Sequence, residues 1–551
     1  DASTDVSWSV EQARWSLDGR YVAAIRTDAT GVARFPIMHW LKPLEEVEWV
    51  PYSKSGWRQA SRALCVIDTV SGAVRSVELE RSGEDIFALQ PLVFDREGRL
   101  LFLVSDRRNK VLELRRADAQ SGTSAVLIEE RQETFVYGIN LAAMLTVATP
   151  LPDGRHLVWM SERDGWRHAY LYTLDGTLVR ALTSGDFEVD RVAGTDNVNG
   201  RIYLVARSDV ARPYDQHLCV VGLDGTSFRQ LTTDPGVHSP MVSPSGATIV
   251  DIHSGVARPP RTDLLTPDGD VVKTLARAET DRLDELGYEP PEQFVTLALD
   301  GVTPIHGAMY LPPRFDAAKR YPVVEYIYAG PQVSLFPNDY SGPSLARLLA
   351  QVGFIGVVLD APGTPGRGKR FQDAVAGRFG QFEIEEHANA LRQLGDRHPF
   401  LDLTRVGIVG GSWGGYNSVR ALLRAPDTYH AGVAIYPVAD CMDHIGTAIE
   451  PYLGLPQDDP AAYAAASSLP LVDRLRGKLY LIHGTSDVNA PFSATMQLVD
   501  AFIKANKPVD LLAIPEMDHS MAGSAGAYVI DRMAEYFAEH LGSARSASPS
   551  A

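Results

Sequence analysis

The stretch Val406-Gly-Ile-Val-Gly-Gly-Ser-Trp-Gly-Gly-Tyr416 decides the fold of this chain. Its first four residues form an apolar run typical of a buried parallel strand, and residues 416–424 follow as a helical pattern. Gly410, Ser412 and Gly414 therefore form a Gly-x-Ser-x-Gly motif at a strand-to-helix turn, where it indicates a nucleophile elbow. The turn favours glycine because it is too tight for Cβ atoms beside the serine. A glycine turn with a purely structural role is the alternative.

The region around this motif alternates strands with helices. The pattern predicts strands at 294–299, 305–311, 323–328, 355–359, 406–409, 431–435, 479–482 and 511–514, and helices at 383–394, 492–504 and 528–541. Such alternation predicts a doubly wound, mostly parallel sheet, with its chemistry at the carboxyl ends of the strands. Together with the elbow it indicates an α/β-hydrolase.

Two further catalytic side chains follow strands of this predicted sheet. Asp487 comes after the strand 479–482 and His519 after the strand 511–514. The order Ser412, Asp487, His519 is that of an α/β-hydrolase triad. His519 would take the serine proton and return it to the leaving group, while Asp487 would fix the tautomer of the imidazole.

Two neighbouring residues compete for these roles. His483 directly follows a strand in a tight His-Gly turn, which favours a structural role. Asp518 adjoins His519 in sequence, but adjacency does not supply the side-chain geometry of a triad.

The first half of the chain repeats a phrase: an aromatic or apolar residue, a polar turn of the Asp-Gly kind, and an alternating strand. It occurs at residues 15–25, 94–103, 151–159 and more loosely 242–250. Repeated short strands of this kind indicate a β-propeller, and some 285 residues would supply roughly six or seven blades. A two-sheet sandwich would explain the hairpins but not the repeated phrase.

A charged stretch that ends in Pro-Pro, residues 277–292, marks the expected boundary between the halves. We predict a propeller over residues 1–285, an α/β-hydrolase domain over 286–543 and a disordered tail over 544–551.

Composition narrows the functional classes. A length of 551 residues favours two domains, and a net charge of -17 argues against nucleic acid or an anionic membrane as partner. No apolar run is long enough for a membrane span.

The three cysteines, Cys65, Cys219 and Cys441, are widely spaced, so the sequence predicts neither a disulfide framework nor a zinc site built on cysteines. We expect no cofactor or metal. Because the chain opens at Asp1 without a targeting segment, we expect a removed leader or an incomplete N-terminus.

Several segments resemble the prolyl oligopeptidase family of serine peptidases, within it the dipeptidyl peptidase IV branch. They are Tyr326-Ile-Tyr-Ala-Gly-Pro-Gln332, Asp360-Ala-Pro-Gly-Thr-Pro-Gly-Arg-Gly368, Gly411-Ser-Trp-Gly-Gly-Tyr416, Tyr452-Leu-Gly-Leu-Pro456, His483-Gly-Thr-Ser-Asp-Val-Asn489, Asp518-His519 and, in the first half, Ser161-Glu-Arg-Asp-Gly-Trp-Arg-His168. The resemblance implies a propeller that caps an α/β-hydrolase and admits short peptides. It implies that Tyr328 and the Trp413 N–H form the oxyanion hole and that Asn489 holds a substrate carbonyl. It also favours a periplasmic or secreted protein, with a cytoplasmic location as the alternative, and the family often forms homodimers.

The sequence departs from this family at two places. Where dipeptidyl peptidases carry a Glu-Glu pair for the substrate amine, this chain has only Asp5, and its propeller half is short for the eight blades of that branch. In the proline pocket Val438 matches, but Cys441, His444 and Ala448 stand where the branch places aromatic rings. A pocket without those rings would bind proline less tightly. The leading hypothesis is a peptidase that releases N-terminal dipeptides. An esterase or acylaminoacyl-type hydrolase, and a propeller binding protein with a vestigial hydrolase, stay open as alternatives.

Overall fold

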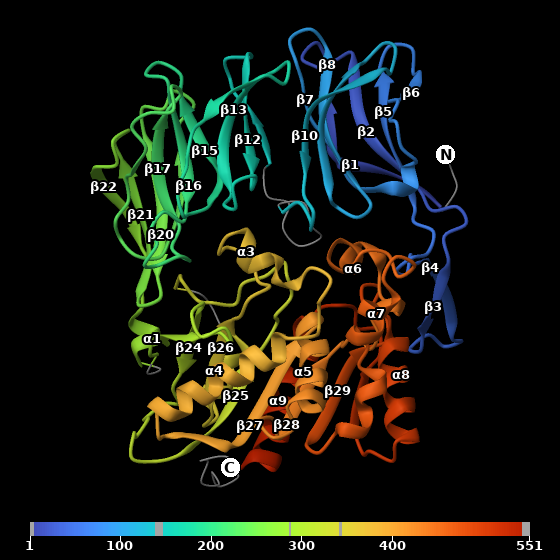
Figure 1. The fold of residues 1–551 in the computed structure, drawn as a ribbon, viewed down its shortest axis with the longest axis vertical. Coiled ribbons are helices and arrows are strands. Elements are labelled where there is room, and N and C mark those ends of the chain that lie inside the picture. The colour runs from blue at the N-terminus through green and yellow to red at the C-terminus, as the bar shows by residue number, and fades with distance from the viewer. Residues whose placement is uncertain (1–4, 138–146, 286–287, 341–343, 543–551) are drawn as a thin grey trace.

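The computed structural model describes residues 5–137, 147–285, 288–340 and 344–542. A set of antiparallel sheets built from the first half of the chain lies over a mixed α/β domain built from the second half (Figure 1). The predicted tail over 544–551 lies outside the described residues. This arrangement confirms the predicted fold class, an all-β propeller followed by an α/β-hydrolase.

The propeller consists of five four-stranded antiparallel sheets in the described part of the chain. In spatial order their strands are β1 (Val6–Trp15), β2 (Tyr21–Asp28), β5 (Ser61–Asp68), β6 (Val74–Ser76); β10 (Ser124–Arg131), β9 (Val111–Asp118), β8 (Arg99–Asp106), β7 (Ile86–Phe94); β11 (Ala148–Pro150), β12 (His156–Ser161), β13 (His168–Thr173), β14 (Leu178–Ala181); β15 (Val189–Asp196), β16 (Arg201–Ala206), β17 (His217–Gly222), β18 (Arg229–Gln230); and β19 (Val237–Val242), β20 (Ile249–Gly255), β21 (Arg258–Leu265), β22 (Val271–Arg277).

The repeated sequence phrase marks the first turn of a blade. Its glycines Gly19, Gly98, Gly154 and Gly246 join the first two strands of four blades, and all have positive φ, which glycine adopts without strain. Gly19 and Gly98 are 79 positions apart (98 − 19), because the first blade carries the extra hairpin β3 (Arg34–His39) and β4 (Glu46–Pro51). The expectation of six or seven blades was therefore wrong, since it assumed a uniform and shorter repeat.

The second half forms one eight-stranded sheet that contains all eight predicted strands. Its order is β23 (Glu292–Leu297), β24 (Pro304–Tyr310), β26 (Ile355–Asp360), β25 (Tyr321–Tyr326), β27 (Leu401–Gly411), β28 (Ala431–Ile435), β29 (Lys478–Gly484) and β30 (Asp510–Ile514). The pairs from β26 to β30 are parallel, and the two pairs that involve β24 are antiparallel. The carboxyl ends of six strands therefore meet at one edge.

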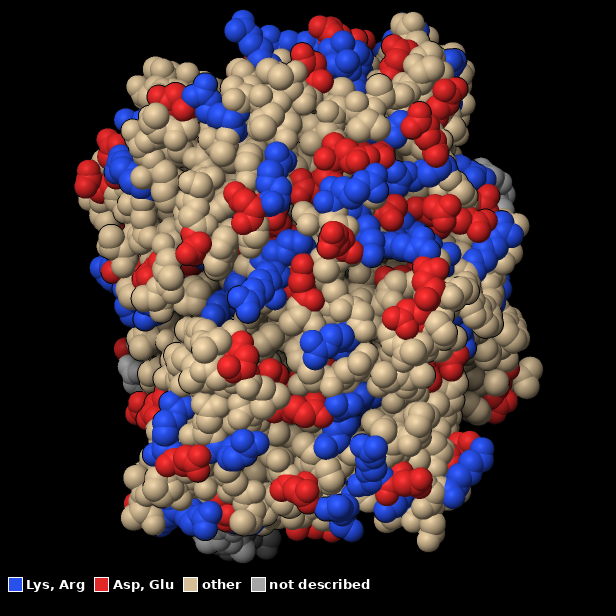
Figure 2. Space-filling model, viewed as in Figure 1, with Lys and Arg blue, Asp and Glu red and all other residues tan. Residues whose placement is uncertain are grey.

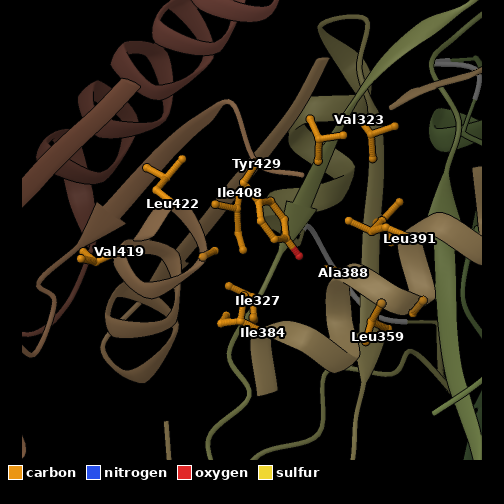
Figure 3. Packing of buried hydrophobic residues seen from close by; sticks show 14 of the residues in the cluster. Val323, Ile327, Leu359, Ile384, Ala388, Leu391, Ile408, Val419, Leu422 and Tyr429 are labelled. Atoms are coloured by element: carbon orange, nitrogen blue, oxygen red, sulfur yellow. The ribbon is translucent and has the colours of Figure 1, made fainter. Parts of the chain in front are cut away.

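Helices cover both faces of this sheet. The α-helices in the described part of the chain are α1 (Asp281–Glu285), α2 (Leu345–Gln351), α3 (Lys369–Gln372), α4 (Glu383–Arg397), α5 (Trp413–Arg424), α6 (Gly446–Leu453), α7 (Pro460–Ala466), α8 (Phe492–Lys504) and α9 (Gly523–Leu541). Single 3-10 turns lie at Gly83–Asp85 in the propeller and at Asp373–Val375, Cys441–Asp443 and Leu469–Arg474 in the second half. On one face Leu391 of α4 and Leu422 of α5 pack with Ile408 of β27 (Figure 3). On the other face α9 buries Met533 and Phe537 against the same sheet. The helix layers on the two faces of the sheet therefore hold the ends of its strands in place.

Buried polar contacts join the propeller to the hydrolase domain. Glu188 accepts the Gly368 N–H at 2.6 Å, and Arg107 binds Glu450 at 2.6 Å. Glu162, from the propeller segment that resembles the family, lies 3.6 Å from Lys369, and burial raises the pKa of its carboxyl to about 7. The propeller is therefore fixed to the hydrolase through residues just ahead of and within α3 and α6.

On the face that Figure 2 shows, acidic and basic side chains are interspersed. Within the described residues, no helix has the length and apolar character to cross a bilayer.

Candidate active site

Ser412 occupies the turn between β27 and α5, where the sequence predicts a nucleophile elbow. Its backbone has φ 58° and ψ -119°, a conformation that costs an L-residue on the order of 1–3 kcal/mol. The flanking positions 410 and 414 require glycine because a backbone carbonyl lies where a Cβ atom would stand. A Cβ atom on Gly410 would lie 2.3 Å from the Ile327 carbonyl oxygen, and one on Gly414 would lie 2.2 Å from the same atom. The strained turn thus exposes Ser412 at the edge of the sheet.

Asp487 and His519 meet at that edge, as predicted. His519 Nδ1 lies 2.6 Å from Asp487 Oδ2, and because a carboxylate accepts, this nitrogen carries the hydrogen. Asp487 Oδ1 accepts the backbone N–H groups of Asn489 at 2.8 Å and Ala490 at 2.9 Å. Burial would raise the pKa of Asp487, but hydrogen bonds from His483 and His519 outweigh it and lower the pKa to about 2. The aspartate is therefore ionised, and His519 Nε2 is left as a base.

The competing residues have their shortest hydrogen bonds outside the proposed triad, although His483 Nε2 also lies 3.5 Å from Asp487 Oδ2. His483 is buried, donates from Nε2 to the Ala490 carbonyl at 2.8 Å and accepts from the Thr495 hydroxyl at 2.7 Å, so it shapes the loop that carries Asp487. Asp518 accepts from the backbone and hydroxyl of Ser520.

Tyr436 links the nucleophile turn to the base. Its ring centroid lies 4.3 Å from that of His519, and a Cβ on Gly411 would lie 2.9 Å from the same ring. Among the described residues, no hydrogen bond joins His519 to Ser412. Catalytic hydrogen bonds are often long before substrate binds and tighten in the complex.

The two expected oxyanion donors adjoin Ser412. Tyr328 follows β25. Burial raises the pKa of this phenol to about 12 against the opposing effect of the nearby Ser412 side chain, so the hydroxyl stays a donor. Asn417 of α5 fixes the Tyr328 carbonyl at 3.0 Å. Trp413 is the first residue of α5, where a backbone N–H has no acceptor within the helix.

The predicted substrate-pocket residues gather around Trp413. Val438 and Ala448 belong to the same buried apolar cluster as Trp413, and the His444 ring lies 4.9 Å from the indole. Burial lowers the pKa of His444 to about 3, so its imidazole is neutral. Asn489 is exposed beside this group. Asp5 lies elsewhere, paired with Arg34 on the first blade, so its carboxylate is already neutralised; its role in amine binding stays a prediction.

The propeller contributes side chains to the site that the sequence did not reveal. The Tyr52 hydroxyl lies 3.3 Å from His444 Nδ1 and donates to the Asn489 carbonyl at 2.9 Å. The Phe135 ring packs edge-on against Tyr452 at 5.1 Å. No local pattern signals such residues, because their partners lie hundreds of positions away.

The hairpin β3–β4 also reaches the loop that carries His519. His39 Nδ1 lies 2.8 Å from Glu516 Oε2, and His39 Nε2 lies 3.2 Å from Glu48 Oε2. Glu516 has a φ of 58° and donates its N–H to the Thr485 hydroxyl at 3.1 Å. The hairpin therefore holds the chain three residues before the base.

This contact predicts a pH-dependent link. Hydrogen bonds to Glu516 and then Glu48 raise the pKa of His39 above 6.5, so the charged pair is intact below that raised pKa and is lost as the pH rises through it. In Glu516→Gln the His39 pKa is expected to fall toward its ordinary value, as measured by NMR titration of the imidazole. Glu48→Gln is the matched control and should produce a smaller decrease. Equal pKa values in wild type and Glu516→Gln would contradict the assignment.

A serine at a strained strand-to-helix turn, an aspartate hydrogen-bonded to a histidine and two candidate oxyanion donors at the edge of a doubly wound sheet form the arrangement expected of a serine hydrolase with the α/β-hydrolase fold. Comparison with known proteins narrows this class. Residues 9–260 match the family described as the dipeptidyl peptidase IV N-terminal region, and residues 340–544 match the prolyl oligopeptidase family. The chain belongs to the prolyl oligopeptidase family of serine peptidases, in its dipeptidyl peptidase IV-like branch.

Named relatives and solved structures agree with this placement. A probable dipeptidyl-aminopeptidase B of Aspergillus clavatus is 28% identical over 95% of this chain and 60% of its own length. Human dipeptidyl peptidase 8 is 32% identical over 66% of this chain and 42% of its own. The crystal structure of Porphyromonas gingivalis dipeptidyl peptidase 4 shares the fold with a TM-score of 0.87 and 23% identity, covering 96% of this chain and 74% of that one. The chain thus spans about 60% of the length of the fungal relative.

Proposed function

We propose that this protein is a serine peptidase that releases dipeptides from the N-termini of short peptides through an acyl-enzyme. The observation that carries the proposal is the 2.6 Å hydrogen bond from His519 to Asp487 beside the strained turn of Ser412. The names of the relatives, dipeptidyl-aminopeptidase B and dipeptidyl peptidase 8, support the dipeptide product.

Each residue of the proposed site has its own role in the reaction. His519 Nε2 takes the proton of Ser412 as the hydroxyl oxygen attacks the scissile carbonyl, and Asp487 stabilises the imidazolium. The Tyr328 hydroxyl and the Trp413 N–H donate to the oxyanion. The imidazolium then gives its proton to the leaving amine. Water activated by the same histidine releases the dipeptide from Ser412.

The pocket favours small residues at the cleaved position. Val438 and Ala448 offer an apolar wall, and neutral His444 replaces an aromatic ring on which proline would stack. Dipeptide amides of Ala-Pro, Ala-Ala and Lys-Ala would test this, with comparable kcat/KM for the first two expected. A strong preference for Ala-Pro would contradict the pocket assignment. Tyr52 and Phe135 from the propeller wall this side of the site, which supports a restriction to short peptides.

A fluorophosphonate probe separates an enzyme from a binding protein. Labelling of Ser412 in the folded chain is expected, and absence of labelling would favour a propeller binding protein with a vestigial hydrolase. A homodimer, suggested by the family resemblance, stays a prediction that sedimentation of the purified chain would test.

Replacing Tyr328 by phenylalanine should lower kcat by about 10²–10³, the usual effect of losing one oxyanion donor. KM should change little, because the hydroxyl acts on the charge that develops in the transition state. Steady-state kinetics with Ala-Ala amide measure both values. The matched control is Tyr326→Phe, since Tyr326 lies at the end of the same strand. An unchanged kcat in Tyr328→Phe would exclude the proposed donor.

A further inference from the structure

A buried group of histidines and aspartates lies on the last propeller blade. His238 of β19 and Asp251 and His253 of β20 place one donor atom each within 4.8 Å of one another. All three side chains are at least nine-tenths buried. Asp263 of β21 adjoins them and is buried to the same extent. We call these four residues the blade cluster.

The blade cluster occupies an interface between blades that is otherwise thinly packed. His238 is in register with His253, and Asp251 with Asp263, on the sheet face that also carries Ile249 and Leu265. The apolar cluster between the last two blades has five buried members, whereas the cluster between the two preceding blades has 13. Polar donors therefore stand where apolar contacts would otherwise hold the last blade in place.

Hydrogen bonds fix which ring nitrogens are free to bind a ligand. His238 Nε2 lies 2.9 Å from the Asp234 carbonyl, so it carries the hydrogen. Nδ1 of the same ring faces Asp251 Oδ2 at 2.6 Å. Without a second hydrogen on the ring, this nitrogen is an acceptor that points at another acceptor, and a cation between the two atoms would bind both. His253 Nε2 lies 3.1 Å from Asp263 Oδ2, and among the described residues its Nδ1 has no hydrogen bond. Histidines that bind metals characteristically donate their other N–H to a carbonyl or carboxylate in this way.

The arginines near the blade cluster pair with other carboxylates than Asp251. Arg261 binds Asp263 at 2.8 Å and Asp234 at 3.5 Å, and Arg258 binds Asp234 at 2.9 Å. Within the described residues the only basic partner of Asp251 is His238, and Asp251 Oδ1 is buried without a hydrogen bond. A buried carboxylate in this state favours a positive charge beside it, which a metal ion or the imidazolium of His238 would supply.

We propose that the blade cluster binds one divalent first-row metal ion of the zinc type and that the ion fastens the last blade to its neighbour. The ligands are Nδ1 of His238, Nδ1 of His253 and the Asp251 carboxylate, while Asp263 orients His253. Two imidazole nitrogens favour zinc over magnesium or calcium. Donor atoms around tetrahedral zinc are about 3.4 Å apart. His238 Nδ1 and Asp251 Oδ2 are 2.6 Å apart, and one donor atom from each of the three residues lies within 4.8 Å of the others, so the separations change by at most about 1.4 Å on binding. Side-chain rotation covers that change.

The test uses the whole purified chain. We expect elemental analysis to find about one equivalent of zinc before chelation, and added zinc to raise the melting temperature of the chelated chain by roughly 2–5 °C. Cobalt should give the visible absorption of a tetrahedral site. Asp251→Asn should abolish all three effects, whereas Asp153→Asn, which alters the half-exposed pair of Asp153 with His156, should leave them unchanged.

Two results would overturn the proposal. One is a wild-type chain that carries no metal and whose melting temperature and cobalt spectrum do not respond; His238 would then be an imidazolium paired with Asp251. The other is equal metal binding by wild type and Asp251→Asn. Because the cobalt spectrum and the chelator-reversible melting shift are measured on wild type, poor folding of the variant does not block the test. Neither readout depends on peptidase activity.

Discussion

Replacing Ser412 by alanine should lower kcat for an Ala-Ala amide by about 10⁶, to the level set by binding and the oxyanion donors alone. The fold should survive, because the strained φ of 58° is imposed by the close packing of Gly410 and Gly414 and is equally strained for alanine. The reaction should stop because no other hydroxyl occupies the elbow. Circular dichroism and the melting temperature check the fold, and loss of fluorophosphonate labelling checks the site.

Ser418→Ala is the matched control for this variant. Ser418 lies on the same helix, is buried and donates to the Gly414 carbonyl at 2.7 Å, so its loss perturbs the helix without removing the nucleophile. A change of only a few-fold in kcat is expected for Ser418→Ala. If Ser412→Ala kept more than a small fraction of the wild-type rate, the nucleophile would have to be sought elsewhere.

The sequence could nominate the three residues of the proposed triad because each of them follows a strand. Ser412, Asp487 and His519 come after β27, β29 and β30, which the sequence marks as apolar runs. In a parallel sheet the carboxyl ends of such strands share an edge, so topology alone brings together residues 75 and 32 positions apart (487 − 412 and 519 − 487). In the structure His519 hydrogen-bonds with Asp487, whereas Asp518 bonds Ser520, which favours Asp487 as the acid of the proposed triad.

Contacts between the domains could not be predicted in the same way. Tyr52 and Asn489 are 437 positions apart, and His39 and Glu516 are 477 apart. Their meeting depends on how the propeller sits on the hydrolase, which no periodicity within either domain encodes. The blade count failed for a related reason, because the hairpin β3–β4 lengthens one repeat without adding a blade. The sequence does not predict the blade cluster, because its proposed ligands come from paired strands rather than from a short metal-binding motif.

Replacing Asp487 by asparagine should lower kcat by on the order of 10⁴ while KM changes little. The reason lies in the two oxygens of this side chain. Oδ1 must accept the N–H groups of Asn489 and Ala490, so the single oxygen of asparagine takes that place. Its amide nitrogen then faces His519 Nδ1 across the 2.6 Å contact and has to donate. His519 is forced into the tautomer with hydrogen on Nε2, which cannot accept the proton of Ser412.

The same substitution should alter stability in a pH-dependent way. The lowered pKa of about 2 means that ionised Asp487 stabilises the folded chain above its ordinary pKa near 4, and that this contribution is lost as the pH falls toward 2. Wild type should therefore exceed Asp487→Asn in melting temperature at pH 7, and the difference should shrink in acid. Asp518→Asn is the control, because Asp518 bonds Ser520 and not the base. A loss of activity in Asp518→Asn as large as in Asp487→Asn would reassign the acid of the triad.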